Sequence, residues 1–275
     1  MAKAKKLDAL AMPDFSKAER NFDVAVVANL IGPIIRLIFG LRIRGAKKLP
    51  KSGPYIVVSN HLTKLDALAI AYFMYFKVKR TPHFLAKEGL FRLPVVGQLL
   101  INAGQIPVYR SAGQKNDEPL RAAYECLRQG GVITIFPEGT LTREPNLWPM
   151  RGRSGAVRLA VEGNVPVFPV GHWGDQDIMD VYGTRINGGF WKKVDILVGD
   201  EIDLRKYRGH KVSTAELAQA TEDVMRAITK QVEELRGEKA PEVLYDPVVH
   251  GQKAVGNFVR KTKAEKQAEK KAKAK

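Results

Sequence analysis

Short apolar runs alternate with amphipathic segments along most of this chain of 275 residues. The apolar runs have the length of strands, and the segments between them repeat apolar residues at helical spacing. The predicted strands are Leu41–Arg44, Tyr55–Ser59, His83–Ala86, Ile106–Tyr109, Val132–Phe136, Val167–Val170 and Val194–Val198. The predicted helices are Leu65–Phe76, Val95–Ile101, Asp117–Arg128, Ser154–Val161 and Thr214–Leu235. Such alternation predicts an α/β fold with one mixed, mostly parallel sheet flanked by helices.

The chain divides into three predicted parts. Residues 1–40 form a basic start and a hydrophobic segment, residues 41–236 form the α/β domain, and residues 237–275 form an extension with a low-complexity basic tail. The one cysteine, Cys126, excludes an internal disulfide and a multi-cysteine zinc site. It falls in an amphipathic helical pattern, which indicates a packing role.

The most hydrophobic segment is Val24–Gly40, which contains Pro33 and Arg36. It reaches only the lower limit of length for a helix that spans a bilayer. We therefore expect a helical segment that lies in the membrane interface or folds as a kinked hairpin, with a buried core helix as the alternative. The basic start is followed by Asp8 and no apolar core of a secretory signal, so none is expected.

The formal net charge of +16 indicates an anionic partner. Nucleic acid, an anionic membrane surface and phosphorylated substrates all fit this charge. No nucleic-acid-binding signature is found, and aromatic residues do not alternate with basic ones, so nucleic acid is not expected. The basic tail, residues 261–275, suits either a solubilising segment or a tether to a lipid surface. A non-catalytic basic membrane- or nucleic-acid-binding protein is the alternative class.

His61 and Asp66 follow directly after the predicted strand Tyr55–Ser59. If His61 lies on the turn and Asp66 in the first turn of the next helix, the carboxylate can hold one nitrogen of the imidazole ring. The other nitrogen then becomes an oriented general base at the end of a strand, where open α/β sheets place their sites.

Arginine and glutamate mark two more strand ends. Arg110 follows Ile106 and Val108 on one side of a short strand, and such an arginine suits the capture of a phosphate or carboxylate. The strand Val132–Phe136 runs into a Pro-Glu-Gly-Thr turn. Backbone amides of such a turn are available to an anion. The candidate side chains around this turn are Glu138, Thr140 and Arg143, and Arg151 and Arg153 follow in a segment that could open a helix N-terminus towards an anion.

Four motifs in this order resemble the blocks of the glycerolipid acyltransferase family. They are NHLTKLD at 60–66, GQIPVYR at 104–110, FPEGT at 136–140 and VPVFPV at 165–170. The best-known bacterial members of this family are 1-acylglycerol-3-phosphate acyltransferases. The resemblance implies the glycerol-3-phosphate acyltransferase-like fold.

The resemblance also implies roles for residues. His61 removes the proton from the acceptor hydroxyl, Asp66 orients His61, and the hydroxyl attacks the thioester of the donor directly. None of the blocks contains a cysteine or an activated serine that would form an acyl-enzyme. Arg110 contacts the phosphate of the acceptor. The residues expected to help to bind the glycerol phosphate are Glu138, Gly139, Thr140 and Lys87, and further phosphate candidates are Arg143 and Arg151.

The resemblance therefore predicts an enzyme of phospholipid biosynthesis at the cytoplasmic face of the cell membrane. It moves a fatty acyl group from acyl-CoA or acyl-carrier protein to lysophosphatidic acid (1-acyl-sn-glycerol 3-phosphate), which gives phosphatidic acid. The alternative acceptors are glycerol 3-phosphate, another lysophospholipid or a glycolipid. No cofactor beyond the co-substrate is expected. No metal site is expected either, because His61 and Asp66 lack a third ligand at a familiar spacing. The other histidines, His83, His172, His210 and His250, are interpreted as structural.

Overall fold

A computed structural model describes the chain except residues 1–14, 16–21, 109–117, 184, 188–190 and 254–275. Its strands are β1 (Phe39–Arg44), β2 (Tyr55–Ser59), β3 (Pro82–Lys87), β4 (Ile106–Val108), β5 (Val132–Ile135), β6 (Val167–Trp173) and β7 (Lys192–Val198). Its α-helices are α2 (Phe22–Ile38), α3 (Asp66–Tyr72), α4 (Val96–Asn102), α5 (Glu118–Arg128), α6 (Gly155–Glu162), α7 (Asp175–Ile178) and α8 (Thr214–Arg236). Short 3₁₀ turns and one π-helical turn, η2 (Phe73–Val78), complete the elements.

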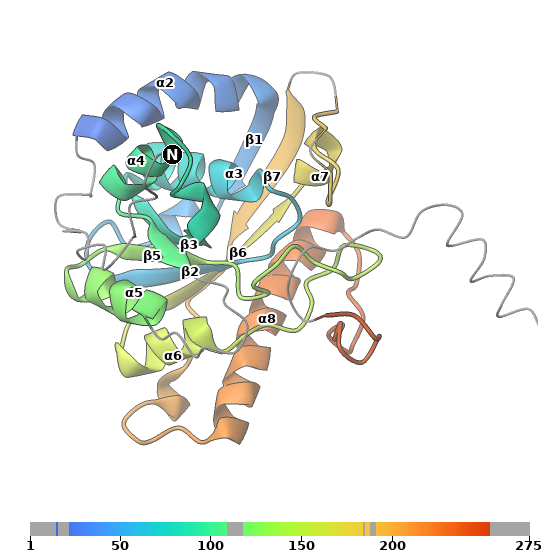
Figure 1. The fold of residues 1–275 in the computed structure, drawn as a ribbon. Helices are drawn as coiled ribbons and strands as arrows, with labels where there is room; N and C mark the ends of the chain where they lie inside the picture. The colour runs from blue at the N-terminus through green and yellow to red at the C-terminus, as the bar shows by residue number, and fades with distance from the viewer. Residues whose placement is uncertain (1–14, 16–21, 109–117, 184, 188–190, 254–275) are drawn as a thin grey trace, which may run out of the picture.

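The strands form one sheet of seven in the order β1-β7-β6-β2-β5-β3-β4 (Figure 1). All neighbouring pairs are parallel except β6 and β7, which are antiparallel. The predicted mixed, mostly parallel α/β sheet is therefore confirmed. Because β2, β3, β5 and β6 run in the same direction, the turns that follow them open at one edge of the sheet.

Helices cover both faces of the sheet, and the side chains of β2 alternate between them. Ile56 and Val58 pack in a core with α5, α6 and α8. Tyr55 and Val57 pack in a second core with α3 and the π-helical turn. Every residue of β2 is buried. A strand that is covered on both faces in this way has an unbroken apolar sequence, which is the pattern seen before His61.

The predicted elements agree with the observed ones to within a few residues, with two informative differences. The helix expected at Leu65–Phe76 is α3, and it continues into a π-helical turn. Strand β6 extends to Trp173, three residues beyond the predicted end at Val170. This extension brings His172 to the edge of the sheet where the turns open.

The hydrophobic segment near the N-terminus is a single continuous helix, α2, with Pro33 inside it, and not a hairpin. One side of α2 packs on the domain through residues such as Ile35. The other side exposes a stripe of apolar residues, which consists of Phe22, Val26, Leu30, Ile34 and Leu37. Leu30 is 70% exposed, so this stripe has no cover within the described chain. Among the described residues, no helix has both the length and the apolar character that a membrane span requires.

Candidate active site

The turn after β2 is fixed by hydrogen bonds to strand β6. The side chain of Asn60 donates from Nδ2 to the carbonyl of His172 (3.0 Å) and accepts at Oδ1 from the backbone N–H of His172 (3.0 Å). Both partners are buried. Since Asn60 directly precedes His61, this pair of bonds sets where the backbone of His61 leaves the sheet.

Asp66 is the first residue of α3, and its carboxylate closes the turn that carries His61. It accepts hydrogen bonds from the backbone N–H of Leu62 (2.5 Å), from the backbone N–H of Thr63 (2.9 Å) and from the hydroxyl of Thr63 (2.7 Å). The side chain of Asp66 is fully buried. An acidic residue here is also stabilised by the N-terminus of the helix. Burial acts to raise the pKa of Asp66, but His172, His61 and Thr63 outweigh it and hold this pKa below its ordinary value.

The ring of His61 meets Asp66 as the sequence predicts. Its Nδ1, at the edge of the ring, lies 2.9 Å from Oδ2 of Asp66. One face of the ring stacks on Phe136, with ring centroids 4.2 Å apart. A carboxylate partner holds the proton on Nδ1, so Nε2 keeps the lone pair of the ring. The side chain is 22% exposed. The geometry therefore gives an oriented base that a solvent-borne hydroxyl group can reach.

Glu138 lies behind the backbone of His61. Its Oε1 accepts from the backbone N–H of His61 (2.9 Å), and its Oε2 accepts from the backbone N–H of Met150 (3.1 Å). The residue is only 2% exposed. Burial raises the pKa of Glu138 to about 8, although these two donors oppose the rise. In this structure the carboxyl group joins the turn after β2 to the segment after β5.

Gly139, Thr140 and Arg143 surround the same turn. Gly139 has φ +70, and a Cβ atom there would come within 3.1 Å of the side chain of Arg153, so the position favours glycine. Thr140 is half-buried and Arg143 is buried. The backbone N–H of Thr142, between them, donates to the carbonyl of His61 (2.7 Å). The turn after β5 is thus held against His61 from both sides.

The remaining predicted residues lie further apart. Lys87 ends β3 and is exposed. Arg151 is largely exposed and forms an ion pair with Asp246 (2.6 Å). Arg110 lies outside the described residues, and its predicted contact with a phosphate stays a prediction.

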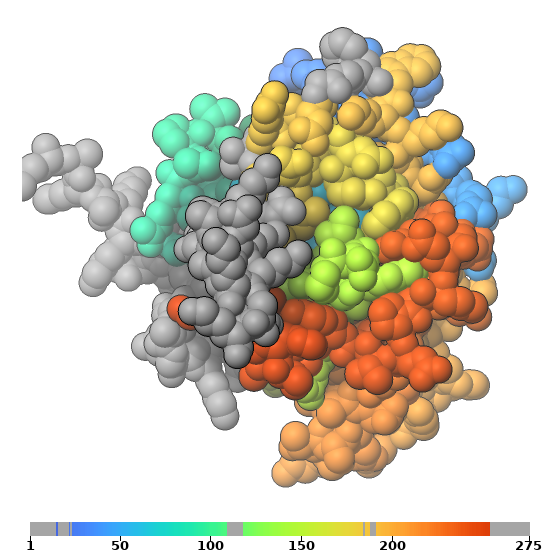
Figure 2. All heavy atoms as spheres, turned by 90° about the vertical axis from the view of Figure 1, so that its right-hand side faces the viewer, coloured from blue at the N-terminus to red at the C-terminus, as the bar shows by residue number. Residues whose placement is uncertain are grey.

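The segment after β5 forms part of an exposed face, drawn in yellow-green in Figure 2. It lies between the segment after β6 (yellow) and the segment after α8 (orange-red). Tyr182 donates its hydroxyl to the carbonyl of Thr142, and Arg151 N–H donates to the carbonyl of Tyr245 (2.9 Å). Segments from three distant parts of the sequence therefore form one rim.

Residues 40–173 match the family model described as Acyltransferase. This part of the chain is similar to acyltransferase domains. The whole chain is 30% identical over 166 residues to a chloroplastic 1-acyl-sn-glycerol-3-phosphate acyltransferase of Brassica napus, and this alignment covers 60% of this chain and 46% of that protein. It is 31% identical over 167 residues to 1-acyl-sn-glycerol-3-phosphate acyltransferase alpha of Homo sapiens, which covers 60% of this chain and 57% of that protein. The chain thus spans about half the length of these relatives.

The fold of the acyltransferase domain also has a solved counterpart. The crystal structure of the 1-acyl-sn-glycerophosphate acyltransferase PlsC from Thermotoga maritima matches with a TM-score of 0.57. The match covers 79% of this chain and 81% of that one, at 23% sequence identity. The glycerolipid acyltransferase resemblance and its fold are confirmed.

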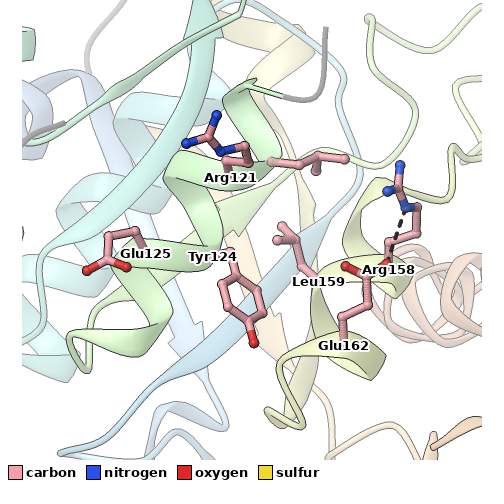
Figure 3. A pocket seen from close by; sticks show the side chains of 7 residues that line it. Arg121, Tyr124, Glu125, Arg158, Leu159 and Glu162 are labelled. Carbon is pink, nitrogen blue, oxygen red and sulfur yellow. Dashed lines mark ion pairs between the residues drawn. The ribbon is translucent and has the colours of Figure 1, made fainter. Parts of the chain in front are cut away.

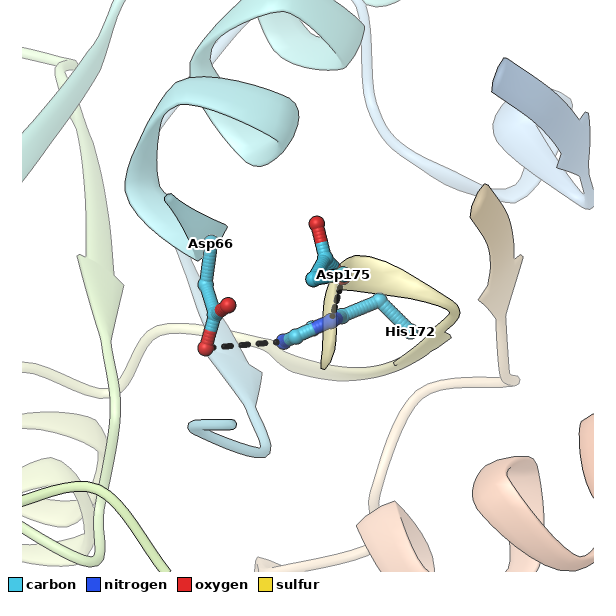
Figure 4. A group of neighbouring side chains, drawn as sticks. All are labelled: Asp66, His172 and Asp175. Carbon is cyan, nitrogen blue, oxygen red and sulfur yellow. Dashed lines mark hydrogen bonds and ion pairs between the residues drawn. The ribbon is translucent and has the colours of Figure 1, made fainter. Parts of the chain in front are cut away.

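Two residues next to Asp66 in the acyltransferase domain were not predicted as part of a site. His172, at the end of β6, and Asp175, at the start of α7, are fully buried beside Asp66 (Figure 4). Nδ1 of His172 lies 2.5 Å from Asp175 Oδ2, and Nε2 lies 2.8 Å from the carbonyl oxygen of Asn60. The adjacency of β6 and β2 in the sheet brings them there, and spacing along the sequence does not reveal it.

The polar atoms of Asp66, His172 and Asp175 lie within 4.8 Å of one another, which is close enough for a metal site. However, each ring nitrogen of His172 already faces a hydrogen-bond acceptor. Such a ring has no lone pair left for a metal ion. Hydrogen bonding alone therefore accounts for the arrangement of the three side chains.

A separate hollow of about 560 Å³ lies between α5 and α6 (Figure 3). Its lining includes Tyr124 and the ion pair of Arg158 with Glu162. None of the predicted site residues lines it. It belongs to the face of the sheet that carries α5 and α6, and the site described above does not include it.

Proposed function

We propose that this chain transfers a fatty acyl group from acyl-CoA or acyl-carrier protein to 1-acyl-sn-glycerol 3-phosphate, which gives phosphatidic acid. The observation that carries the proposal is the contact of His61 Nδ1 with Asp66, which leaves the lone pair on Nε2 of a side chain that is 22% exposed. The names of the two relatives, both 1-acyl-sn-glycerol-3-phosphate acyltransferases, support the acceptor.

In the proposed reaction His61 acts as the general base. Its Nε2 takes the proton of the acceptor hydroxyl while the hydroxyl oxygen attacks the thioester carbonyl of the donor. The new ester C–O bond forms, the C–S bond breaks, and the leaving thiolate takes up a proton. Asp66 stabilises the positive charge that develops on the ring of His61. The chain supplies this step without a covalent acyl-enzyme.

The acceptor phosphate requires cations near the same edge of the sheet. Lys87 is a good candidate because it ends β3, which pairs with β5, the strand that leads to the turn with Glu138. We propose that Lys87 and Arg110 hold the phosphate, with Gly139 and Thr140 next to the glycerol and Arg143 behind them. Glu138, whose oxygens accept from two backbone amides, supports the site from inside. Arg151, which is paired with Asp246, contributes to the rim.

The apolar stripe of α2 supports a peripheral association with a membrane. Five large apolar side chains on one face of a helix form a contiguous exposed apolar patch. Such a patch marks a site of contact with a protein or a membrane, whereas single exposed apolar residues do not. Leu93 and Val95, just before α4, and Val96, its first residue, are also exposed, and α4 packs beside α2. We propose that this face lies in the interface of the cytoplasmic leaflet, where the basic chain meets anionic lipids.

The test measures transfer from a labelled acyl donor, supplied as acyl-CoA or as acyl-carrier protein, to two acceptors in parallel. Wild type is expected to give phosphatidic acid from lysophosphatidic acid, and no product from glycerol 3-phosphate. His61→Ala is expected to lose about 10²–10⁴-fold in turnover. The matched control is His210→Ala, an exposed histidine that pairs with Glu216.

Product from glycerol 3-phosphate would contradict the proposed acceptor and would leave the acyl-transfer chemistry unchanged. A His61→Ala variant that kept more than about a tenth of the wild-type turnover would contradict the role of His61 as general base.

A further inference from the structure

The ring of His172 is enclosed by acceptors. One nitrogen faces the carboxylate of Asp175 at 2.5 Å and the other faces the carbonyl of Asn60 at 2.8 Å. A carbonyl oxygen only accepts, so Nε2 must carry a proton. Nδ1 faces a carboxylate oxygen, which also accepts when it is ionised. A ring that donates from both nitrogens is an imidazolium ion.

The same ring reaches the carboxylate that holds His61. Nε2 of His172 lies 3.5 Å from Asp66 Oδ2, the oxygen that His61 Nδ1 contacts at 2.9 Å. His172 and Asp66 are fully buried, so water does not screen this contact. Figure 4 shows the ring of His172 between the two carboxyl groups of Asp66 and Asp175.

We propose that His172 is a positioning residue of this site: a buried, doubly protonated ring, held by Asp175, that shares the carboxylate of Asp66 with His61. The proposal rests on the proposed role of His61 as general base. The positive ring balances part of the charge of Asp66. Less of that charge then remains to attract a proton to His61, which must be unprotonated to act.

The surroundings of His172 supply few other charges. Along β6 the side chains alternate, and a Cβ atom on the neighbouring Gly171 would meet Gln231 of α8, so His172 faces the opposite side of the sheet. On that side the titratable groups are Asp66 of α3, Asp175 of α7 and, beyond Asp66, His61. Strand β7 pairs with His172 through the apolar Ile196. Among the described residues, the charge of Asp66 also acts on Glu138.

The balance of charges supports the same assignment. Burial opposes the charged ring, but the charges of Asp66 and Asp175 raise the pKa of His172 to about 9. Burial also raises the pKa of Asp175, which His172 opposes. If His172 were removed, Asp66 would keep its donors from Leu62 and Thr63 and would lose the largest of the charges that hold its pKa down against burial.

The first experiment observes the ring directly by NMR of full-length protein with ¹⁵N-labelled histidine. The signal of His172 is assigned by its loss in His172→Gln. Protons on both nitrogens are expected at pH 7, with loss of one proton only near pH 9. In Asp175→Asn that loss is expected at lower pH, because the counter-charge is gone. A ring with a single proton at pH 7 would overturn the proposal, whatever the enzyme does.

The second experiment measures the pH profile of kcat/KM for His172→Gln. Without the positive ring, the negative charge of Asp66 beside His61 is no longer partly balanced, so the acid-side fall of kcat/KM is expected to move to higher pH. The matched control, His83→Gln, removes another buried histidine of the sheet that lies outside the site, and its profile is expected to keep its position.

An acid-side fall that stays in place, or moves to lower pH, would overturn the proposal, because a merely structural loss changes the rate alone. If His172→Gln does not fold, the Asp175→Asn variant is used, because it keeps the shape of the side chain. The pH at which the NMR signal of His172 shows the loss of a proton in this variant then tests the proposal. If His61→Ala stays active, the proposed function fails, while the NMR result still decides the charge of His172.

Discussion

The carboxyl group of Glu138 accepts a hydrogen bond from the backbone N–H of His61, 77 positions earlier in the chain. Its second oxygen accepts from Met150. Glu138 therefore connects the candidate base to the segment after β5 from the buried side. The sequence motif alone predicts that the side chain of Glu138 contacts the substrate. In the structure, both of its carboxylate oxygens accept from backbone N–H groups of the protein.

Glu138→Gln should destabilise the protein. The amide nitrogen of glutamine would face the N–H of either His61 or Met150, and a buried donor without its acceptor costs about 1–3 kcal/mol. The free energy of unfolding from urea denaturation measures this cost. Glu125→Gln, at a half-buried carboxylate of α5 that pairs with the exposed Arg128, serves as the control. Equal stability of the two variants would show that the bonds of Glu138 do not matter.

Asp66→Asn should fold but lose about 10²-fold or more in turnover. The amide nitrogen of asparagine only donates, so one of the bonds from Leu62 and Thr63 is lost, the side chain turns, and His61 loses the partner that holds its proton on Nδ1. Steady-state kinetics with circular dichroism separate turnover from folding. Asp177→Asn, in α7 outside this network, is expected to keep the wild-type rate. Wild-type turnover of Asp66→Asn would remove Asp66 from the mechanism.

The stability of the protein should fall between pH 6.5 and about 9 through His172. The pKa of His172 is raised to about 9 in the folded state. A group with a raised pKa stabilises fully below its unfolded value and loses this contribution as the pH rises through the folded value. The loss is at most about 3 kcal/mol. Urea denaturation across this range should show a steeper decline for wild type than for His172→Gln, and parallel curves would contradict the assignment.

Leu30→Lys and Ile34→Lys should weaken binding to vesicles that contain anionic lipid. Each change places a charge in the middle of the exposed stripe of α2, while the folded domain loses no buried contact. Vesicle sedimentation measures the bound fraction. Val243→Lys makes the same change at an exposed apolar residue after α8 and should leave binding intact. Unchanged binding of the α2 variants would exclude this face as the membrane contact.

Local patterns predicted most of the fold. The fully buried β2 produced an unbroken apolar run, and α8 begins at Thr214, where its helix was predicted to begin, after the N-cap Ser213 with its capping box to Glu216. The meeting of His61 and Asp66 was also predictable, because both lie on one turn. The partners of this pair come from elsewhere: Phe136 from the end of β5, and His172 from the end of β6. Their positions depend on the order of strands in the sheet, which no local pattern contains.

The C-terminal part of the described chain bears on when the site can form during synthesis. Arg236 lies between the rings of Trp148 and Trp173 and donates to the carbonyl of Asn146 (2.8 Å). Tyr245 bridges to Met150, whose N–H holds Glu138. Chains emerge from the ribosome N-terminus first. A nascent chain that already contains all four motifs therefore still lacks Arg236 and Tyr245, and the loop behind His61 gains these contacts only when both residues have emerged.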